Sequence, residues 1–93
     1  MKWASSQQRA VALVERAKRL REKGETKEAI LLLNKAITIA PTYSLAYFQR
    51  APNRSWEGDR KGSIKDNTEV IRLDPKLAAH ASPGTISEIK KLP

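Results

Sequence analysis

Residues 10–41 read AVALVERAKRLREKGETKEAILLLNKAITIAP, and this stretch decides the fold because its pattern returns 34 residues later. Apolar residues recur at the three- and four-residue spacing of an α-helix until Gly24, and again between Ala29 and Pro41. Glycine ends the first series and proline ends the second, as is common at helix C-termini. The stretch therefore predicts a helix, a tight turn, a second helix and a stop.

The second occurrence of the pattern repeats the residues that punctuate the first. Identical residues stand at this interval in five pairs: Gly24 and Gly58, Pro41 and Pro75, Ala17 and Ala51, Ile30 and Ile64, and Ile37 and Ile71. A period of this length is typical of stacked repeats. We expect two successive helical hairpins. Ser5 or Ser6 should cap the first helix, which should end near residue 23, and the other helices should span about 26–40, 43–57 and 59–73.

Both copies resemble the tetratricopeptide repeat family, whose pattern places large, small and aromatic residues at fixed positions of two helices, followed by proline. The matching positions are Leu13, Arg16, Ala17, Leu20, Gly24, Ala29, Leu33, Ala36 and Pro41 in the first copy, and Tyr47, Arg50, Ala51, Arg54, Gly58, Ser63, Asn67, Val70 and Pro75 in the second. The segment RLDPKLA at residues 72–78 is similar to the family's junction between repeats.

The resemblance implies an all-α fold, a right-handed stack of two antiparallel helical hairpins (an α-solenoid) with a C-terminal capping helix. Residues 1–93 would form one domain, with repeat 1 at about 10–43, repeat 2 at about 44–77 and the cap at about 78–93. A capping box at Thr85 and Glu88, followed by an apolar stripe of Ile86, Ile89 and Leu92, fits the capping role.

The second copy departs from the family's pattern at three positions. Pro52 falls inside the predicted third helix, where it removes a backbone hydrogen bond. Arg54 and Asn67 stand where the family has aromatic residues, and a buried polar group without a partner is costly. We therefore expect a kinked, loosened or repacked second hairpin, with Trp56 filling the gap.

Composition excludes several classes of function. The chain has no cysteine, one histidine (His80) and no cluster of metal-ligand residues, so we expect no catalytic site, no metal and no cofactor. No apolar run is long enough to cross a membrane, and MKWASSQQ lacks the apolar segment of a signal peptide. These features favour a cytoplasmic or nuclear protein that binds other molecules without contacting membranes.

The family resemblance also implies where a partner would bind, in a groove lined by the first helix of each hairpin. The groove positions are Val11, Val14, Lys18, Arg21, Leu45, Phe48, Gln49, Pro52 and Ser55. Val14 and Phe48 would form an apolar floor, and Lys18 and Arg21 a basic rim. Such a groove suits a protein or peptide partner with apolar anchors and an acidic group.

Three alternatives stay open at this point. The formal charge of +8 also suits nucleic acid, which would bind the basic helical surface. The chain could instead be a designed or truncated repeat without a native partner, and its uncovered repeat faces could support self-association. A basic surface that only keeps the protein in solution would account for the charge as well.

Overall fold

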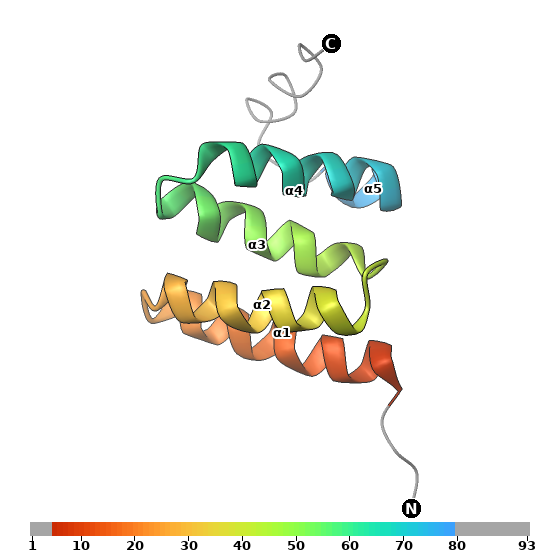
Figure 1. Ribbon diagram of the computed structural model, residues 1–93, viewed down its shortest axis with the longest axis horizontal. Coiled ribbons are helices and arrows are strands. Elements are labelled where there is room, and N and C mark those ends of the chain that lie inside the picture. Colours follow the sequence, from red (N-terminus) through yellow and green to blue (C-terminus); the bar gives the residue numbers. More distant parts are fainter. Residues whose placement is uncertain (1–4, 80–93) are drawn as a thin grey trace, which may run out of the picture.

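The computed structural model describes residues 5–79, which contain helices and no strand (Figure 1). The helices are α1 (Ser6–Glu22), α2 (Thr26–Ile39), α3 (Ser44–Trp56), α4 (Arg60–Leu73) and α5 (Pro75–Ala78). The four long helices lie within about one residue of the bounds that the sequence pattern predicts. The all-α prediction is thus confirmed for the described part of the chain, and the predicted cap at Thr85–Glu88 lies outside it.

Serine begins the first helix through a reciprocal pair of hydrogen bonds. The Ser5 hydroxyl accepts from the backbone N–H of Gln8 at 3.1 Å, and the Gln8 side-chain oxygen accepts from the Ser5 N–H at 2.9 Å. This capping box satisfies two backbone donors at the helix start. Of the two serines that could cap α1, Ser5 is therefore the one that does.

The two glycine turns have the same geometry. Gly24 has a φ of 83° and Gly58 a φ of 86°, a left-handed conformation that glycine adopts without a steric penalty. After each glycine, the next N–H returns to a carbonyl in the last helical turn, from Glu25 to Leu20 and from Asp59 to Arg54, both at 2.8 Å. This hydrogen bond is typical of a Schellman motif. The recurrence of glycine in the sequence therefore reflects a recurrence of backbone structure.

The long helices lie in neighbouring rows, with α1 beside α2, α2 beside α3 and α3 beside α4 (Figure 1). The two glycine turns lie at the same end of this arrangement. A hydrogen bond connects the two turn regions, because the hydroxyl of Thr26, the first residue of α2, donates to the carboxylate of Glu57, which follows α3. The helix α1 also contacts α3, and the short α5 packs against α3 and α4. Two helical pairs are thus held together by α2, α3 and their turns.

Small side chains allow the helices of each pair to approach closely. The first core cluster consists of Ala10, Val14, Ala17, Ala29, Leu33, Ala36 and Ala46. A second cluster contains Tyr47, Val70 and Ala78, and Ile37 packs against both clusters. Leu33 is fully buried and is the largest such side chain. The first hairpin therefore holds most of the buried apolar residues.

The departures in the second hairpin are accommodated differently from our expectation. The helix α3 continues through Pro52 to Trp56, and the side-chain amide of Asn53 donates to the Gln49 carbonyl at 2.7 Å. Trp56 does not fill a gap, because 79% of its surface is exposed. That part of the prediction is wrong. Charged side chains occupy the space between α3 and α4 instead.

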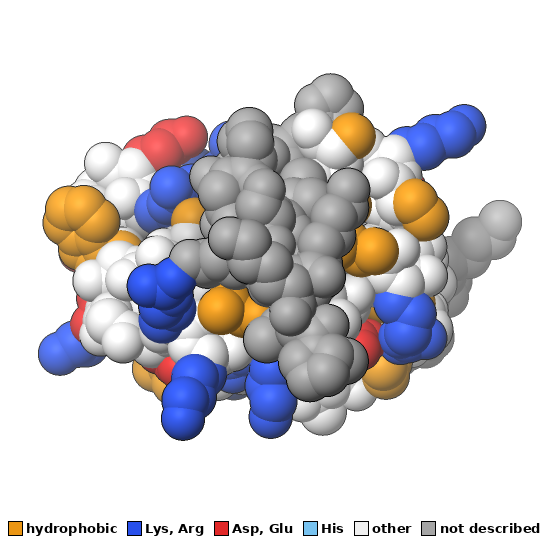
Figure 2. Space-filling model, turned by 90° about the horizontal axis from the view of Figure 1, so that it is seen from above, with side chains coloured by type: hydrophobic (Ala, Val, Ile, Leu, Met, Phe, Trp, Pro, Cys, Tyr) orange, Lys and Arg blue, Asp and Glu red, His pale blue; other side chains and the backbone are white. Residues whose placement is uncertain are grey.

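The last described layer of the stack is formed by α4 with α5. Seen from this end, apolar side chains lie among Lys and Arg side chains (Figure 2). Ile64, Ile71 and Leu77 are half-buried there. None of the helices described at residues 5–79 is long and apolar enough to cross a bilayer.

Candidate functional site

An open hollow lies between α1 and α3 and is the site that we consider for binding. It has a volume of about 360 Å³ and is lined by Lys18, Arg21, Glu22 and Gln49. The three α1 residues are spaced three and four apart, so they project from one face of that helix. Gln49 lies on α3 and lines the opposite side of the hollow. Three of these four residues, Lys18, Arg21 and Gln49, are groove positions that the family resemblance implies.

The hollow contains free cations. Lys18 and Arg21 are exposed, and within residues 5–79 neither forms an ion pair or a side-chain hydrogen bond. Together with Glu22 they leave one net positive charge beside the Gln49 amide. An exposed ammonium and guanidinium can bind a carboxylate, and an amide side chain can hydrogen-bond both backbone groups of a peptide. The hollow therefore presents the kinds of polar group that hydrogen-bond carboxylates and peptide backbones.

The apolar floor that we predicted is largely absent. Val14 is 2% exposed and belongs to the first core cluster, so it cannot contact a ligand. Phe48 is half-buried and packs against the second core cluster. Leu45 is also half-buried, against the first cluster. The residues predicted for the floor thus hold the helices together.

The remaining predicted groove residues lie at the surface. Val11 is 37% exposed on α1. On α3, Pro52 is half-buried and Ser55 is exposed. None of these three residues lines the hollow. Lys18 and Arg21, which we predicted as the basic rim of the groove, thus lie beside Gln49 in one hollow. The apolar positions predicted for the groove lie either in the core or elsewhere on the surface.

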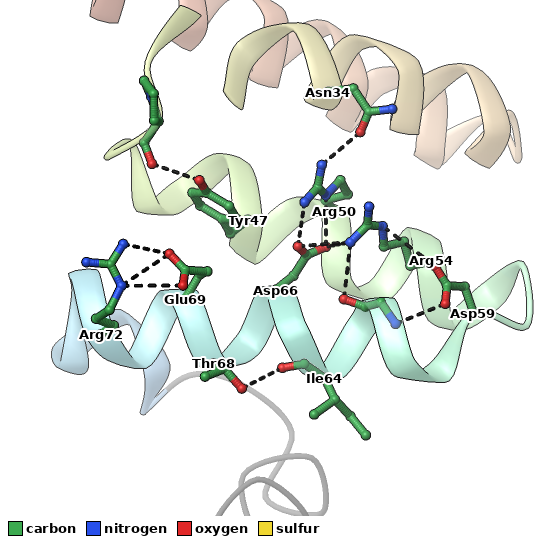
Figure 3. A network of polar contacts seen from close by, with 12 residues as sticks. Asn34, Tyr47, Arg50, Arg54, Asp59, Ile64, Asp66, Thr68, Glu69 and Arg72 are labelled. Carbon is green, nitrogen blue, oxygen red and sulfur yellow. Dashed lines mark hydrogen bonds and ion pairs between the residues drawn. The ribbon is translucent and has the colours of Figure 1, made fainter. Parts of the chain in front are cut away.

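A second hollow, of about 480 Å³, lies between α3 and α4, and its charged side chains other than the exposed Lys65 form pairs within the described residues (Figure 3). Asp66 is buried and accepts hydrogen bonds from Arg50 Nε at 2.9 Å, Arg50 Nη2 at 2.7 Å and Arg54 Nη1 at 3.1 Å. Arg50 also donates to the side-chain oxygen of Asn34 on α2 at 2.8 Å. This network connects α2, α3 and α4. Arg50, Arg54 and Asp66 are engaged with one another and are therefore not available to a ligand.

Two further polar side chains of the second hollow, Tyr47 and Glu69, also form hydrogen bonds within the chain. The Tyr47 hydroxyl donates to the Pro41 carbonyl at 2.8 Å, and burial, followed by the Glu69 carboxylate, raises the pKa of Tyr47. Glu69 accepts a hydrogen bond from Arg72 at 2.7 Å, which holds the pKa of Glu69 below its usual value. Both groups keep their ordinary charge near neutral pH. We therefore assign a structural role to this hollow.

Sequence reasoning missed two residues that matter here. Glu22 lines the first hollow, and Asp66 pairs with two arginines. A signal for Asp66 was present, since Arg50 and Arg54 share one face of α3 and a buried arginine needs an acidic partner. Glu22 gave no such signal.

The described residues contain no cluster of metal-ligand side chains. Across residues 5–79 no group of three or more histidine, aspartate or glutamate side chains could hold a metal ion. His80 and Trp3 lie outside the described part of the chain. No protein-family model matches this sequence, and no curated protein matches it.

Proposed function

We propose that the protein is a tetratricopeptide-like interaction module that binds an acidic segment of another protein between α1 and α3. The observation that carries this proposal is the hollow of Lys18, Arg21, Glu22 and Gln49, in which two cations have no partner within the described residues. Elsewhere on α3, Arg50 and Arg54 are engaged by Asp66. Cations without partners in a concave surface attract an acidic ligand.

The hairpin geometry supports the family part of the proposal. Ala17 and Ala51 are buried at corresponding positions, as are Ala29 and Ser63. Small residues at these positions allow the close helix approach that the repeat requires. The equivalent φ angles of the two glycine turns point the same way. A right-handed stack with a groove on the side of α1 and α3 would follow from this family.

The direct test is binding of a defined acidic peptide. The probe is a fluorescein-labelled peptide of glutamate and alanine with one phenylalanine, titrated with protein and followed by fluorescence anisotropy. We expect Lys18→Glu combined with Arg21→Glu to weaken binding about tenfold, because exposed charge pairs contribute up to about 1 kcal/mol each and two are lost. Added salt should weaken binding to the wild type in the same way.

The matched control reverses two other charges of the same helix. Arg16 and Arg19 are exposed on α1 and do not line the hollow. Arg16→Glu with Arg19→Glu changes the net charge equally and should leave peptide binding almost unaltered. A labelled single-stranded oligonucleotide tests the alternative partner. Equal losses in both double variants, with tight oligonucleotide binding that falls steeply with salt, would replace this proposal by nucleic-acid binding.

A further inference from the structure

Trp56 is an unusual surface residue, because a large apolar side chain is left 79% exposed at the end of α3. Folding does not explain this placement, since the indole buries little area. Exposed tryptophans are over-represented among the residues that dominate binding energy at interfaces. An indole offers a large contact area and loses little conformational freedom on binding.

The position of Trp56 relates it to the hollow. Trp56 follows Gln49 by seven residues on α3, which is about two helical turns, so the two residues share a helix face about 10 Å apart. The next residue, Glu57, accepts a side-chain hydrogen bond from Thr26, the first residue of α2. This bond connects the end of α3 beside Trp56 to the start of α2. Trp56 thus stands in line with the hollow, toward the end of the stack that carries both glycine turns.

We propose that Trp56 is the apolar anchor of the ligand that binds at Lys18 and Arg21, an inference that rests on the proposed function. The ligand is an extended acidic segment whose aromatic or long aliphatic side chain stacks on the indole. An extended chain advances about 3.3 Å per residue, so a distance of about 10 Å corresponds to about three residues. A ligand whose acidic residue lies beside Gln49 in the hollow would therefore place an apolar residue about three positions away on the indole. The free cations supply the charge complementarity that selects the acidic part.

The test compares peptides that differ only in the apolar residue. One labelled peptide carries glutamates with phenylalanine three positions away, a second has alanine in place of phenylalanine, and a third has phenylalanine next to the glutamates. We expect the first peptide to bind about tenfold more tightly than the other two. Trp56→Ala should remove this difference and leave the alanine peptide unchanged. Leu31→Ala, a control at a residue 62% exposed on α2, should change neither.

A spectroscopic readout reports on the indole itself. The chain has two tryptophans, so Trp3→Phe leaves Trp56 as the single indole. Its fluorescence should shift to shorter wavelength when the first peptide binds, because stacking removes the indole from water. Circular dichroism should show unchanged helix content in Trp56→Ala, since an exposed side chain contributes little to packing.

Each contrary result has a distinct meaning. Peptide binding that depends on Lys18 and Arg21 but not on Trp56, without a spectral shift, would overturn this inference and leave the proposed function intact. A shift that depends on protein concentration in the absence of peptide would show that a second copy covers Trp56, which also overturns it. Binding of none of the peptides would contradict the proposed function together with this inference.

Discussion

The carboxylate of Asp66 receives hydrogen bonds from two arginines that lie one turn apart on α3. Arg50 also donates a hydrogen bond to the side-chain oxygen of Asn34 on α2. The side chain of Asp66 is only 2% exposed. A buried charge is tolerated when it is paired and hydrogen-bonded, and this one is. Charge pairing thus replaces part of the apolar packing between α3 and α4.

Removing this carboxylate should be costly. Asp66→Asn leaves two guanidinium groups facing an amide, and breaking a buried pair on one side typically costs about 3–5 kcal/mol. We expect a loss near the lower end of that range, because both arginines retain some contact with water. Urea denaturation followed by circular dichroism measures it.

Glu69→Gln is the matched control for Asp66→Asn. It also removes one carboxylate from α4, but the Glu69–Arg72 pair lies at the surface, where ion pairs contribute little to stability. We expect its denaturation midpoint to stay close to that of the wild type. Equal midpoints for the two variants would show that the Asp66 network adds nothing to stability.

The helix α3 keeps its α-helical conformation through Pro52, although proline offers no N–H to the preceding turn. Asn53 adds a side-chain donor to the Gln49 carbonyl, one residue beyond the acceptor that Pro52 leaves open. This side-chain bond goes to a neighbouring carbonyl, so it does not replace the hydrogen bond that Pro52 lacks, and the steric cost of the ring also remains.

Pro52→Ala should stabilise the protein. Alanine restores the missing donor in a helix that already continues through this position, and the gain should approach about 3 kcal/mol at most. Pro75→Ala is the control, since Pro75 begins α5 at a position where proline is favoured and no gain is expected. Thermal unfolding of both variants provides the comparison. A lower melting temperature for Pro52→Ala would mean that Pro52 is needed for the shape of α3.

Over the whole molecule, apolar burial is uneven. The first hairpin contains Leu33, Val14 and most of the buried alanines, whereas the α3–α4 pair depends on the Asp66 network and a smaller apolar cluster. Gly62 also lies close to neighbouring groups, and a Cβ there would collide with the Asp59 carboxylate. Thr26, Asn34 and Ile37 connect the two pairs.

Native-state hydrogen exchange should reflect this difference. We expect slower exchange for backbone amides of residues 29–39 in α2 than for residues 64–73 in α4, because local opening is easier where fewer apolar contacts are lost. In Asp66→Asn the protection of α4 should fall further, while that of α2 falls less. Equal protection in the two segments, or better protection of α4, would show that the polar network stabilises the second hairpin as well as the apolar core stabilises the first.

The sequence by itself determined the helices and their turns. The apolar spacing, Gly24, Gly58, Pro41 and Pro75 act through hydrogen bonds and steric limits within a few residues of themselves. For this reason the predicted helix bounds agree with the structure to about one residue. Lys18 and Arg21 line one hollow because they lie three residues apart on α1, which is a local property of the sequence, whereas Gln49 reaches that hollow through the packing of α3 against α1.

Only the tertiary structure decided which side chains are buried and which are free. Val14 became a core residue and Trp56 an exposed one, contrary to their expected places. Asp66 found Arg50 and Arg54 across a helix interface, which no local pattern fixes. These outcomes depend on how closely two helices approach and on what lies opposite each residue. Such contacts join residues far apart in the chain, so their energies depend on the packed structure and cannot be read from a local sequence pattern.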